Sequence, residues 1–207
     1  MSAKTIVLAA LAFIGLGFLV KPSEAATGQS SGAPEKTGPR PTADGSPAFA
    51  QALVAAARES LAQGVREKNV NSGDVIDGWL KALGINPPAN WCAAAVAAWL
   101  RRAEEMTGIK RPIAGSAGAK NTMTQFQAAN RWLTVAEARA HGITPGMVPV
   151  WHRGDEGAWT GHIGVVDSYK GGDTFQTIEG NSGPMADRVA SMTRSLSDPK
   201  LLGFGVV

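Results

Sequence analysis

The sequence predicts an α+β fold in which helices come first along the chain and strands follow. Between residues 47 and 141, apolar side chains recur every three or four positions, which is the period of an amphipathic helix. After Pro145-Gly146 the period changes, and short β-branched segments alternate with turn residues. Helices grouped ahead of an antiparallel sheet favour α+β over a doubly wound parallel sheet, in which helices and strands would alternate.

Three helices with one apolar face each are expected in the first half of the folded region, over residues 47–61, 72–83 and 90–107. Ser72 is predicted to be the N-cap of the second helix. Gly84 and Gly108 are predicted to end the second and third helices. Pro87-Pro88 lies in the loop between them, because proline is not tolerated in a helix interior.

Two shorter helices and four strands complete the predicted order. The helices are expected at 122–132 and 134–141, the latter opened by a capping box between Thr134 and Glu137. The strands are expected at 147–151, 162–169, 174–179 and 201–207. A turn at 170–173 joins the second and third strands into a hairpin. Pro149 implies that the first strand lies at an edge or carries a bulge.

The N-terminal segment is predicted to lie outside the folded domain. Residues 1–25 follow the secretory signal pattern, with Lys4, an apolar run from Ile6 to Val20 and a small-x-small site ending at Ala25. The alternative is an uncleaved membrane anchor formed by residues 6–20, because about 17 apolar residues can span a bilayer. Either reading predicts export to the cell envelope, as a periplasmic, secreted or membrane-anchored protein.

A linker is predicted to separate this segment from the folded domain. Residues 26–47 are rich in Gly, Pro, Ser and Thr and contain almost no large apolar side chain. Such a composition cannot bury enough surface to offset the entropy of ordering, so we expect a flexible linker. The folded domain is then residues 48–207, long enough for one good core.

Composition argues against several classes of partner and site. Twenty basic and 17 acidic residues give a net charge of +3, and no stripe of Lys and Arg marks a nucleic-acid footprint. One cysteine and three histidines cannot build a zinc finger. Asp155 and Glu156 fall short of a Ca²⁺ ligand set. We therefore expect no nucleic acid, metal or cofactor, and we expect a monomer.

Cys92 is the single cysteine of the chain. In an exported protein it cannot form an internal disulfide. It is predicted to lie in the first turn of a helix, where unpaired N–H groups and the helix dipole favour the nucleophilic thiolate. Two alternatives stay open on position alone. Cysteine is among the most buried residue types, and a leftover thiol can pair between molecules.

The predicted hairpin brings a base and two orienting groups together. With a two- or four-residue loop, the indices of opposed residues sum to 341 or 343, so His162 lies across from Glu179 or Asn181. Because strand side chains alternate between faces, all three then project on the same side. If the helix of Cys92 packs there, nucleophile, base and orienting group are assembled.

The remaining histidines give weaker signals. His152 lies in a charged loop and is the rival base. His141 precedes a glycine at a predicted helix end, where a histidine can interact with the terminal carbonyls.

Several motifs, in this order, resemble those of CHAP domains, the cysteine, histidine-dependent amidohydrolase/peptidase group. They are Asn71-Ser72-Gly73 with the following helix, Asn90-Trp91-Cys92-Ala93-Ala94, Gly161-His162-Ile163-Gly164-Val165-Val166, Ile178-Glu179-Gly180-Asn181, and Arg194-Ser195 with residues 202–206. The resemblance covers about residues 60–207. Two departures are the segment 146–151, where the family usually has a Gly-Asp pair, and the charged insertion 152–160.

The resemblance implies a papain-like α+β fold and cleavage of an amide bond in peptidoglycan, as an amidase or an endopeptidase. Carried over by motif, Cys92 attacks the carbonyl carbon and His162 serves as base and then acid. Glu179 orients the imidazole, with Asn181 as the alternative. A backbone N–H at the start of the Cys92 helix would stabilise the oxyanion. The alternatives are a cell-wall binding module on the same fold and a papain-like acyltransferase or general protease.

Overall fold

The computed structural model describes residues 45–207, and the segment predicted as signal peptide or anchor lies outside them, as does most of the predicted linker. In chain order the described elements are α1 (Pro47–Ala62), α2 (Asp74–Lys81), α3 (Cys92–Thr107), α4 (Ala119–Ala128), β1 (Trp132–Leu133), α5 (Val135–His141), β2 (Val148–His152), β3 (Gly161–Ile163), β4 (Val165–Tyr169), β5 (Thr174–Ser182), β6 (Arg188–Ser195) and β7 (Leu201–Gly205). All five described helices therefore precede every described strand except the short β1, and the predicted α+β class is confirmed.

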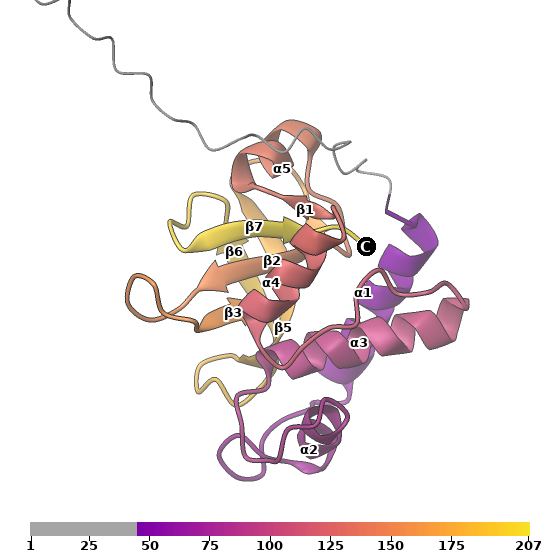
Figure 1. Cartoon of the computed structure of the whole chain (residues 1–207), viewed down its shortest axis with the longest axis vertical. Helices are drawn as coiled ribbons and strands as arrows, with labels where there is room; N and C mark the ends of the chain where they lie inside the picture. Colours follow the sequence, from indigo (N-terminus) through magenta and orange to yellow (C-terminus); the bar gives the residue numbers. More distant parts are fainter. Residues whose placement is uncertain (1–44) are drawn as a thin grey trace, which may run out of the picture. The chain divides into compact units, whose positions relative to one another are not determined.

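The strands form two antiparallel sheets, where the sequence had suggested one. The first has the order β1-β7-β2-β3 and the second the order β4-β5-β6. In the view of Figure 1, α4 lies in front of β2 and β7, while β5 and β6 lie behind them. Helix α3 packs against both β3 and β5. Its first turn thus lies where the two sheets meet.

Two hydrophobic clusters hold these layers together. The larger one joins the helices to the sheets through fully buried side chains that include Leu53, Trp91 and Trp99. The smaller one lies between the sheets, where the rings of Trp151 and Phe175 stack with centroids 6.4 Å apart. Burial of such large side chains is the main favourable term in folding, so these two clusters stabilise the junction of α3 with the sheets and the contact between the sheets.

The helices follow the predicted pattern with two corrections. Helix α2 is capped by Gly73 and begins at Asp74, because the Ser72 hydroxyl donates to the Asp77 carboxylate at 2.9 Å and does not cap the helix as expected. Helix α4 covers 119–128 where 122–132 was expected. It ends early because Asn130 adopts a left-handed conformation with φ of 55°, which a helix interior does not allow.

The predicted strand over residues 162–169 is split at Gly164 into β3 and β4, which belong to different sheets. A Cβ at Gly164 would lie 2.6 Å from Cγ of Glu179, so the close approach of the two backbones requires glycine here. The predicted register is found where β4 meets β5, because Val165 pairs with Ile178 and their indices sum to 343. The predicted pairing of His162 with Glu179 or Asn181 is wrong, because His162 on β3 pairs with Trp151 of β2 in the other sheet.

Strands β1 and β6 were not predicted. The alternating side chains of β6 are mostly polar and half-exposed, so the strand carries little hydrophobic signal and is held by its pairing with β5. Pro149 lies on β2, which runs between β7 and β3, so the edge position is wrong. The predicted bulge is found next to it, between Val150 and Trp151.

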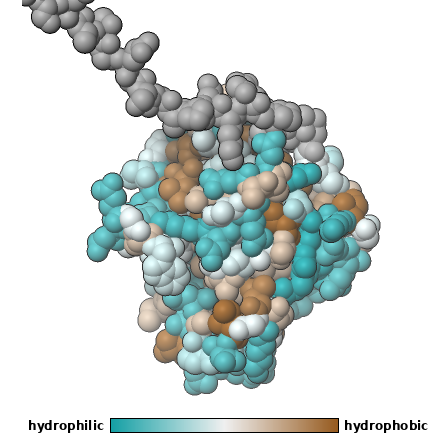
Figure 2. Space-filling model, in the orientation of Figure 1, coloured by the Kyte–Doolittle hydropathy of each residue, from teal (hydrophilic) through white to brown (hydrophobic). Residues whose placement is uncertain are grey.

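The surface is mostly polar. Figure 2 shows hydrophobic residues as separate patches among hydrophilic ones on the face seen in Figure 1. Within residues 45–207, no helix combines the length and the apolar character that crossing a membrane requires. The most exposed large apolar side chain among these residues is Trp159, at 81%.

Candidate active site

Cys92 is the first residue of α3, and its side chain lines a cleft of about 870 Å³. The residue is 6% exposed. Trp91 is the N-cap and supplies no side-chain acceptor, so the N–H groups of the first turn keep their hydrogen-bonding capacity. The thiol therefore lies beside uncapped amide donors at the positive end of a helix, where negative charge on sulfur or on a neighbouring oxygen is stabilised.

His162 on β3 reaches Glu179 on β5. Its Nε2 lies 2.7 Å from Oε2 of Glu179, and the two residues are 2% and 0% exposed. Because an ionised carboxylate can only accept, Nε2 carries the hydrogen and donates. The free lone pair then belongs to Nδ1, which is the nitrogen available to act as a base.

The second ring nitrogen is the one left for the thiol. Nδ1 of His162 is buried and forms no hydrogen bond of ordinary geometry within residues 45–207. Burial lowers the pKa of His162, but the Cys92 thiol and the Glu179 carboxylate outweigh burial and raise it. The Cys92 thiol is thus near enough to the imidazole to affect its pKa, but it forms no well-aligned hydrogen bond with Nδ1. Catalytic hydrogen bonds are often long or poorly aligned in sites without substrate.

Glu179 is the most densely bonded side chain of the site. Besides His162, its carboxylate accepts from the hydroxyls of Thr177 at 2.6 Å and Ser182 at 3.1 Å. The guanidinium of Arg194 on β6 binds both carboxylate oxygens, with Nε 2.7 Å from Oε1. Burial raises the pKa of Glu179, but the hydrogen bonds and charges of Arg194 and His162 lower it from 4.5 to about 2. The carboxylate therefore stays charged at neutral pH.

Arg194 and Trp151 were missed as site residues by the sequence reading. The Arg194 guanidinium carbon lies 5.0 Å from the centroid of the Trp151 ring, a cation–π distance. The same indole lies 6.0 Å from the imidazole of His162. Trp151 therefore covers the His162–Glu179–Arg194 chain on one side and keeps water from it, which strengthens its charged hydrogen bonds.

Asn181 lies at the end of β5 and lines the cleft, but it makes no hydrogen bond to His162. Its Nδ2 donates to the backbone oxygen of Ala186 at 2.5 Å and to Oε1 of Glu67 at 3.3 Å. Of the two orienting groups that the sequence left open, the geometry brings Glu179 to the ring.

The cleft beside Cys92 combines apolar side chains with amide and hydroxyl groups. Its lining is Leu83, Ile85, Ala89, Asn90, Cys92, residues 115–119, Asn121, Gln125, Arg153, Trp159, Thr160, Gly161 and Asn181. Among these lining residues Arg153 alone is charged, and it forms no ion pair within residues 45–207.

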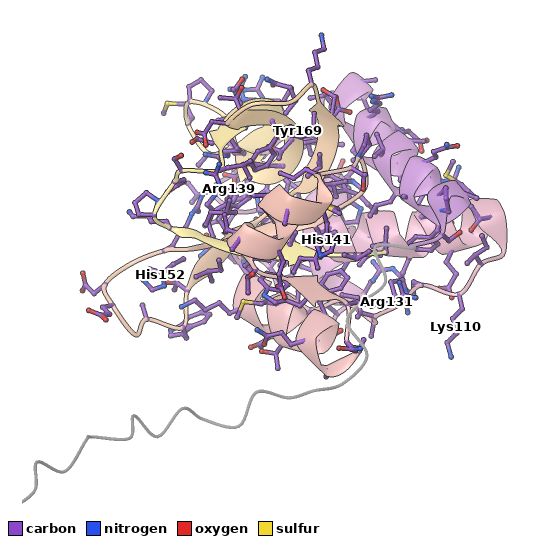
Figure 3. All side chains as sticks on the ribbon, turned by 90° about the horizontal axis from the view of Figure 1, so that it is seen from above. Lys110, Arg131, Arg139, His141, His152 and Tyr169 are labelled. Carbon is purple, nitrogen blue, oxygen red and sulfur yellow. The ribbon has the colours of Figure 1, made fainter. Side chains whose placement is uncertain are left out.

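The other two histidines lie elsewhere. Figure 3 labels both of them, His152 at the end of β2 and His141 at the end of α5. The Nδ1 of His152 lies 2.8 Å from Nζ of Lys120, and its Nε2 meets the backbone oxygens of Gly154 and Asp155. His152 therefore ties down the loop between β2 and β3 and has no carboxylate partner in the described structure.

Residues 85–181 match the family model of the CHAP domain. The matched segment contains Cys92, His162, Glu179 and Asn181 and ends at the last of them. No curated protein and no solved structure matches the chain. Within residues 45–207, no group of three His, Cys, Asp or Glu side chains is close enough to hold a metal ion.

Proposed function

We propose that this chain, whose residues 85–181 match the family model of the CHAP domain, the cysteine- and histidine-dependent amidohydrolase/peptidase domain of papain-like fold, hydrolyses an amide bond of peptidoglycan. The observation that carries the proposal is the 2.7 Å contact between the buried His162 and Glu179, with Cys92 at the start of α3 close enough to the imidazole to raise its pKa. A nucleophile, a base and a charged group that orients the base are the parts that acyl transfer requires.

In the first step, Nδ1 of His162 takes the thiol proton and the Cys92 sulfur attacks the amide carbonyl carbon. A carbon–sulfur bond forms, the carbonyl π bond opens, and the oxygen takes the negative charge. The uncapped N–H groups at the start of α3 are suited to hold that oxygen. Glu179 stabilises the imidazolium that has formed and fixes Nε2–H, which keeps Nδ1 facing the thiol.

In the second step, the imidazolium gives its proton to the amine nitrogen as the carbon–nitrogen bond breaks. The amine leaves, and a thioester to Cys92 remains. A water molecule then attacks the thioester carbon while His162 again takes a proton. The collapse of this second intermediate releases the carboxylic acid and returns the proton to sulfur. The same groups therefore serve both halves of the reaction.

The cleft suits a peptide substrate that carries carboxylates, as peptidoglycan stem peptides do. Arg153 is the charged group of the lining and is free to bind a carboxylate. The amide of Asn121 also lines the cleft and can exchange hydrogen bonds with a peptide backbone, whereas the amide of Gln125 is already bonded to the backbone of Gly115. The exposed indole of Trp159 offers a flat apolar surface beside them. The proposal extends to export of the chain by residues 1–25, which would bring the enzyme to its polymeric substrate.

Digestion of purified sacculi by wild type and by Cys92→Ser tests the proposed function. We expect the wild type to release soluble muropeptides and the variant to release none, because a hydroxyl is a far weaker nucleophile beside this imidazole. The volume change is small, so circular dichroism should show an unchanged fold. Mass spectrometry of the products identifies the cut bond and so separates an amidase from an endopeptidase.

The same assay discriminates the alternatives. A wild type that binds sacculi without releasing fragments would favour a non-catalytic wall-binding module and overturn the proposal. Cleavage of casein with no release from sacculi would favour a general protease. Products that carry a new amide in place of a free carboxylate would indicate an acyltransferase.

A further inference from the structure

Glu67 joins two segments that flank the nucleophile. It lies in the loop between α1 and α2, and its Oε1 accepts from Nε1–H of Trp91 at 2.9 Å and from Nδ2–H of Asn181 at 3.3 Å. Trp91 is the residue before Cys92, and Asn181 lies two residues beyond Glu179. One carboxylate oxygen thus bridges the start of the nucleophile helix and the end of the strand that carries the orienting acid.

The other oxygen of Glu67 fixes the loop that leads into the nucleophile. Oε2 accepts from the backbone N–H of Asn71 at 2.8 Å. The carbonyl of Asn71 in turn accepts from the N–H of Ala89, three residues before Cys92, at 3.3 Å. The approach to Cys92 is therefore held to Glu67 by two routes, one through the Trp91 indole and one through Asn71.

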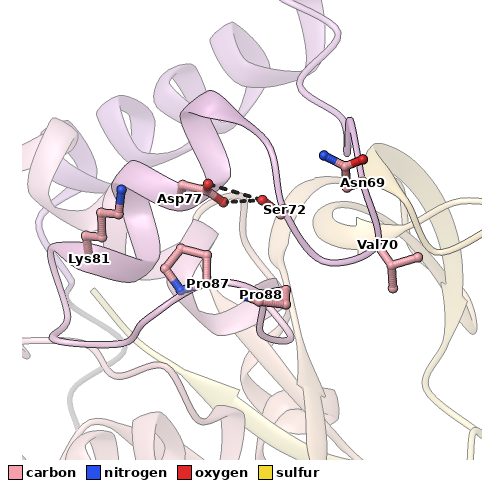
Figure 4. Close-up of a pocket in the computed structure, with 7 residues that line it drawn as sticks. All are labelled: Asn69, Val70, Ser72, Asp77, Lys81, Pro87 and Pro88. Atoms are coloured by element: carbon pink, nitrogen blue, oxygen red, sulfur yellow. Dashed lines mark hydrogen bonds between the residues drawn. The ribbon is translucent and has the colours of Figure 1, made fainter.

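The outer side of the Glu67 loop is closed by separate contacts. There Ser72 donates to Asp77, and the surrounding side chains line a shallow cavity of about 380 Å³ (Figure 4). Neither oxygen of Glu67 takes part in that cavity. The carboxylate serves the inner side of the loop, toward Trp91 and Asn181.

The Trp91 ring transmits this anchoring to the catalytic strand. Trp91 is fully buried, and a Cβ at Gly180 would lie 2.8 Å from its Cζ3. The indole is therefore pressed against the backbone between Glu179 and Asn181. Its Nε1–H has Glu67 as its partner. A ring that can tilt would change the distance between α3 and β5, and with it the approach of Cys92 to His162.

We propose that Glu67 is a positioning residue of the active centre, which holds the Cys92 end of α3 in register with the Glu179–Asn181 end of β5. The proposal rests on the proposed function, since it names a further residue on which that reaction depends. Glu67 does not touch the reacting atoms. It acts through Trp91 and Asn181, and a displacement of about 1 Å at a reacting group can cost on the order of 10²-fold in rate.

A carboxylate is required here because all three partners are donors. An ionised carboxylate accepts at both oxygens, whereas a glutamine offers one accepting oxygen and one donating amide. In Glu67→Gln, either Asn71 N–H or the Trp91–Asn181 pair would face a second donor. A partly buried donor that loses its acceptor costs more free energy than the removal of both the donor and the acceptor.

The experiment compares Glu67→Gln with wild type in the full chain by two readouts. The first is the rate of Cys92 alkylation by iodoacetamide, which needs no peptidoglycan. The second is kcat and KM on a soluble muropeptide. We expect the alkylation rate and kcat to fall together, by about 10- to 10²-fold, with KM changed much less.

Asp187→Asn is the matched control for a purely structural effect. The carboxylate of Asp187 pairs with Arg66, the neighbour of Glu67, and with Arg188, and within residues 45–207 it forms no hydrogen bond to Trp91 or Asn181. The backbone bond from Glu67 N–H to the Asp187 oxygen is kept in this variant. We expect this variant to lower Tm without slowing alkylation or turnover. If Glu67→Gln likewise lowers Tm and leaves both rates at the wild-type value, Glu67 is structural and the proposal is wrong.

Trp91→Phe is the second variant, for the case that Glu67→Gln does not fold. It breaks the contact with Glu67 from the other side, because phenylalanine lacks the indole N–H and part of the ring. Alkylation slowed in Trp91→Phe supports the proposal, and alkylation at the wild-type rate overturns it. The two proposals also fail separately. A wild type that releases nothing from sacculi overturns the proposed function, while slower alkylation in Glu67→Gln would still show that Glu67 positions the thiol.

Discussion

Two histidines lie on neighbouring paired strands, and only one of them has the surroundings of a base. Trp151 pairs with His162 and His152 pairs with Gly161 across β2 and β3, so the two rings project from opposite faces of the sheet. His162 points to the side where β5 supplies a carboxylate. His152 points toward α4, where Lys120 supplies a cation.

The difference shows that the partner decides the chemistry of a histidine in this fold. A buried carboxylate fixes the tautomer of His162 and raises its pKa together with Cys92. His152 is surrounded by Nζ of Lys120 and backbone oxygens, which hold a loop but prepare no base. A one-residue shift of β3 would turn His162 to the opposite face of the sheet, away from Glu179, because side chains alternate between faces.

Replacement of each histidine by alanine should separate the two most clearly, with the loss confined to His162. His162→Ala should lower kcat on a muropeptide by about 10³-fold or more, since it removes the general base and acid. His152→Ala should keep kcat within a few-fold, roughly the scale of a loop effect remote from the chemistry. A dead His152→Ala beside an active His162→Ala would reverse the assignment.

Glu179→Gln should have the next largest effect. The amide keeps the size of the side chain but loses the charge that stabilises the imidazolium. Neutralising the acid of a serine triad costs about 10⁴ in turnover, and a thiol depends on this help less, so we expect a loss on the order of 10–10³. Asn181→Ala, measured on the same substrate, should cost less. The reverse order would give the orienting role to Asn181.

The depressed pKa of Glu179 predicts a specific dependence of stability on pH. Its pKa falls from 4.5 unfolded to about 2 folded, so its contribution is present above pH 4.5 and is lost as the pH falls from 4.5 toward 2. The free energy of unfolding in urea, measured at about pH 5 and about pH 3, should therefore drop more for wild type than for Glu179→Gln. If the free energy of unfolding fell equally in the two proteins, the pKa of Glu179 in the folded state would not be depressed.

The smallest expected effect concerns the loop that His152 holds. Arg153→Gln should raise KM for a muropeptide with free carboxylates by about 3- to 10-fold, the scale of one exposed charged contact, and leave kcat nearly unchanged. The same peptide with its carboxylates amidated should show no difference between the two proteins. An equal rise for both peptides would mean that Arg153 supports the loop and does not read substrate charge.

Much of this site could be predicted because short motifs and strand alternation are local signals. Cys92 at a helix start and the index sum of 343 between β4 and β5 both follow from positions close in the sequence. The break at Gly164 could not be seen, since it depends on how closely the β5 backbone approaches. The 162–169 segment has the alternation of one strand, and only packing divides it.

The supporting residues were missed for a different reason. Arg194 lies on β6, a strand with little hydrophobic signal, and it reaches Glu179 only because Phe175 pairs with Arg194 in that sheet. Glu67 is separated from Asn181 by most of the domain. Contacts of this kind depend on tertiary register, which no local pattern in the chain encodes.

Alkylation of the folded protein tests whether His162 activates the Cys92 thiol. At about pH 6 a free thiol, with a pKa near 8.5, is almost entirely protonated and reacts slowly with iodoacetamide. We expect Cys92 of the wild type to be alkylated rapidly at this pH and His162→Ala to slow the reaction by about 10-fold or more. Equal rates in the two proteins, both matching that of a free thiol, would contradict this activation.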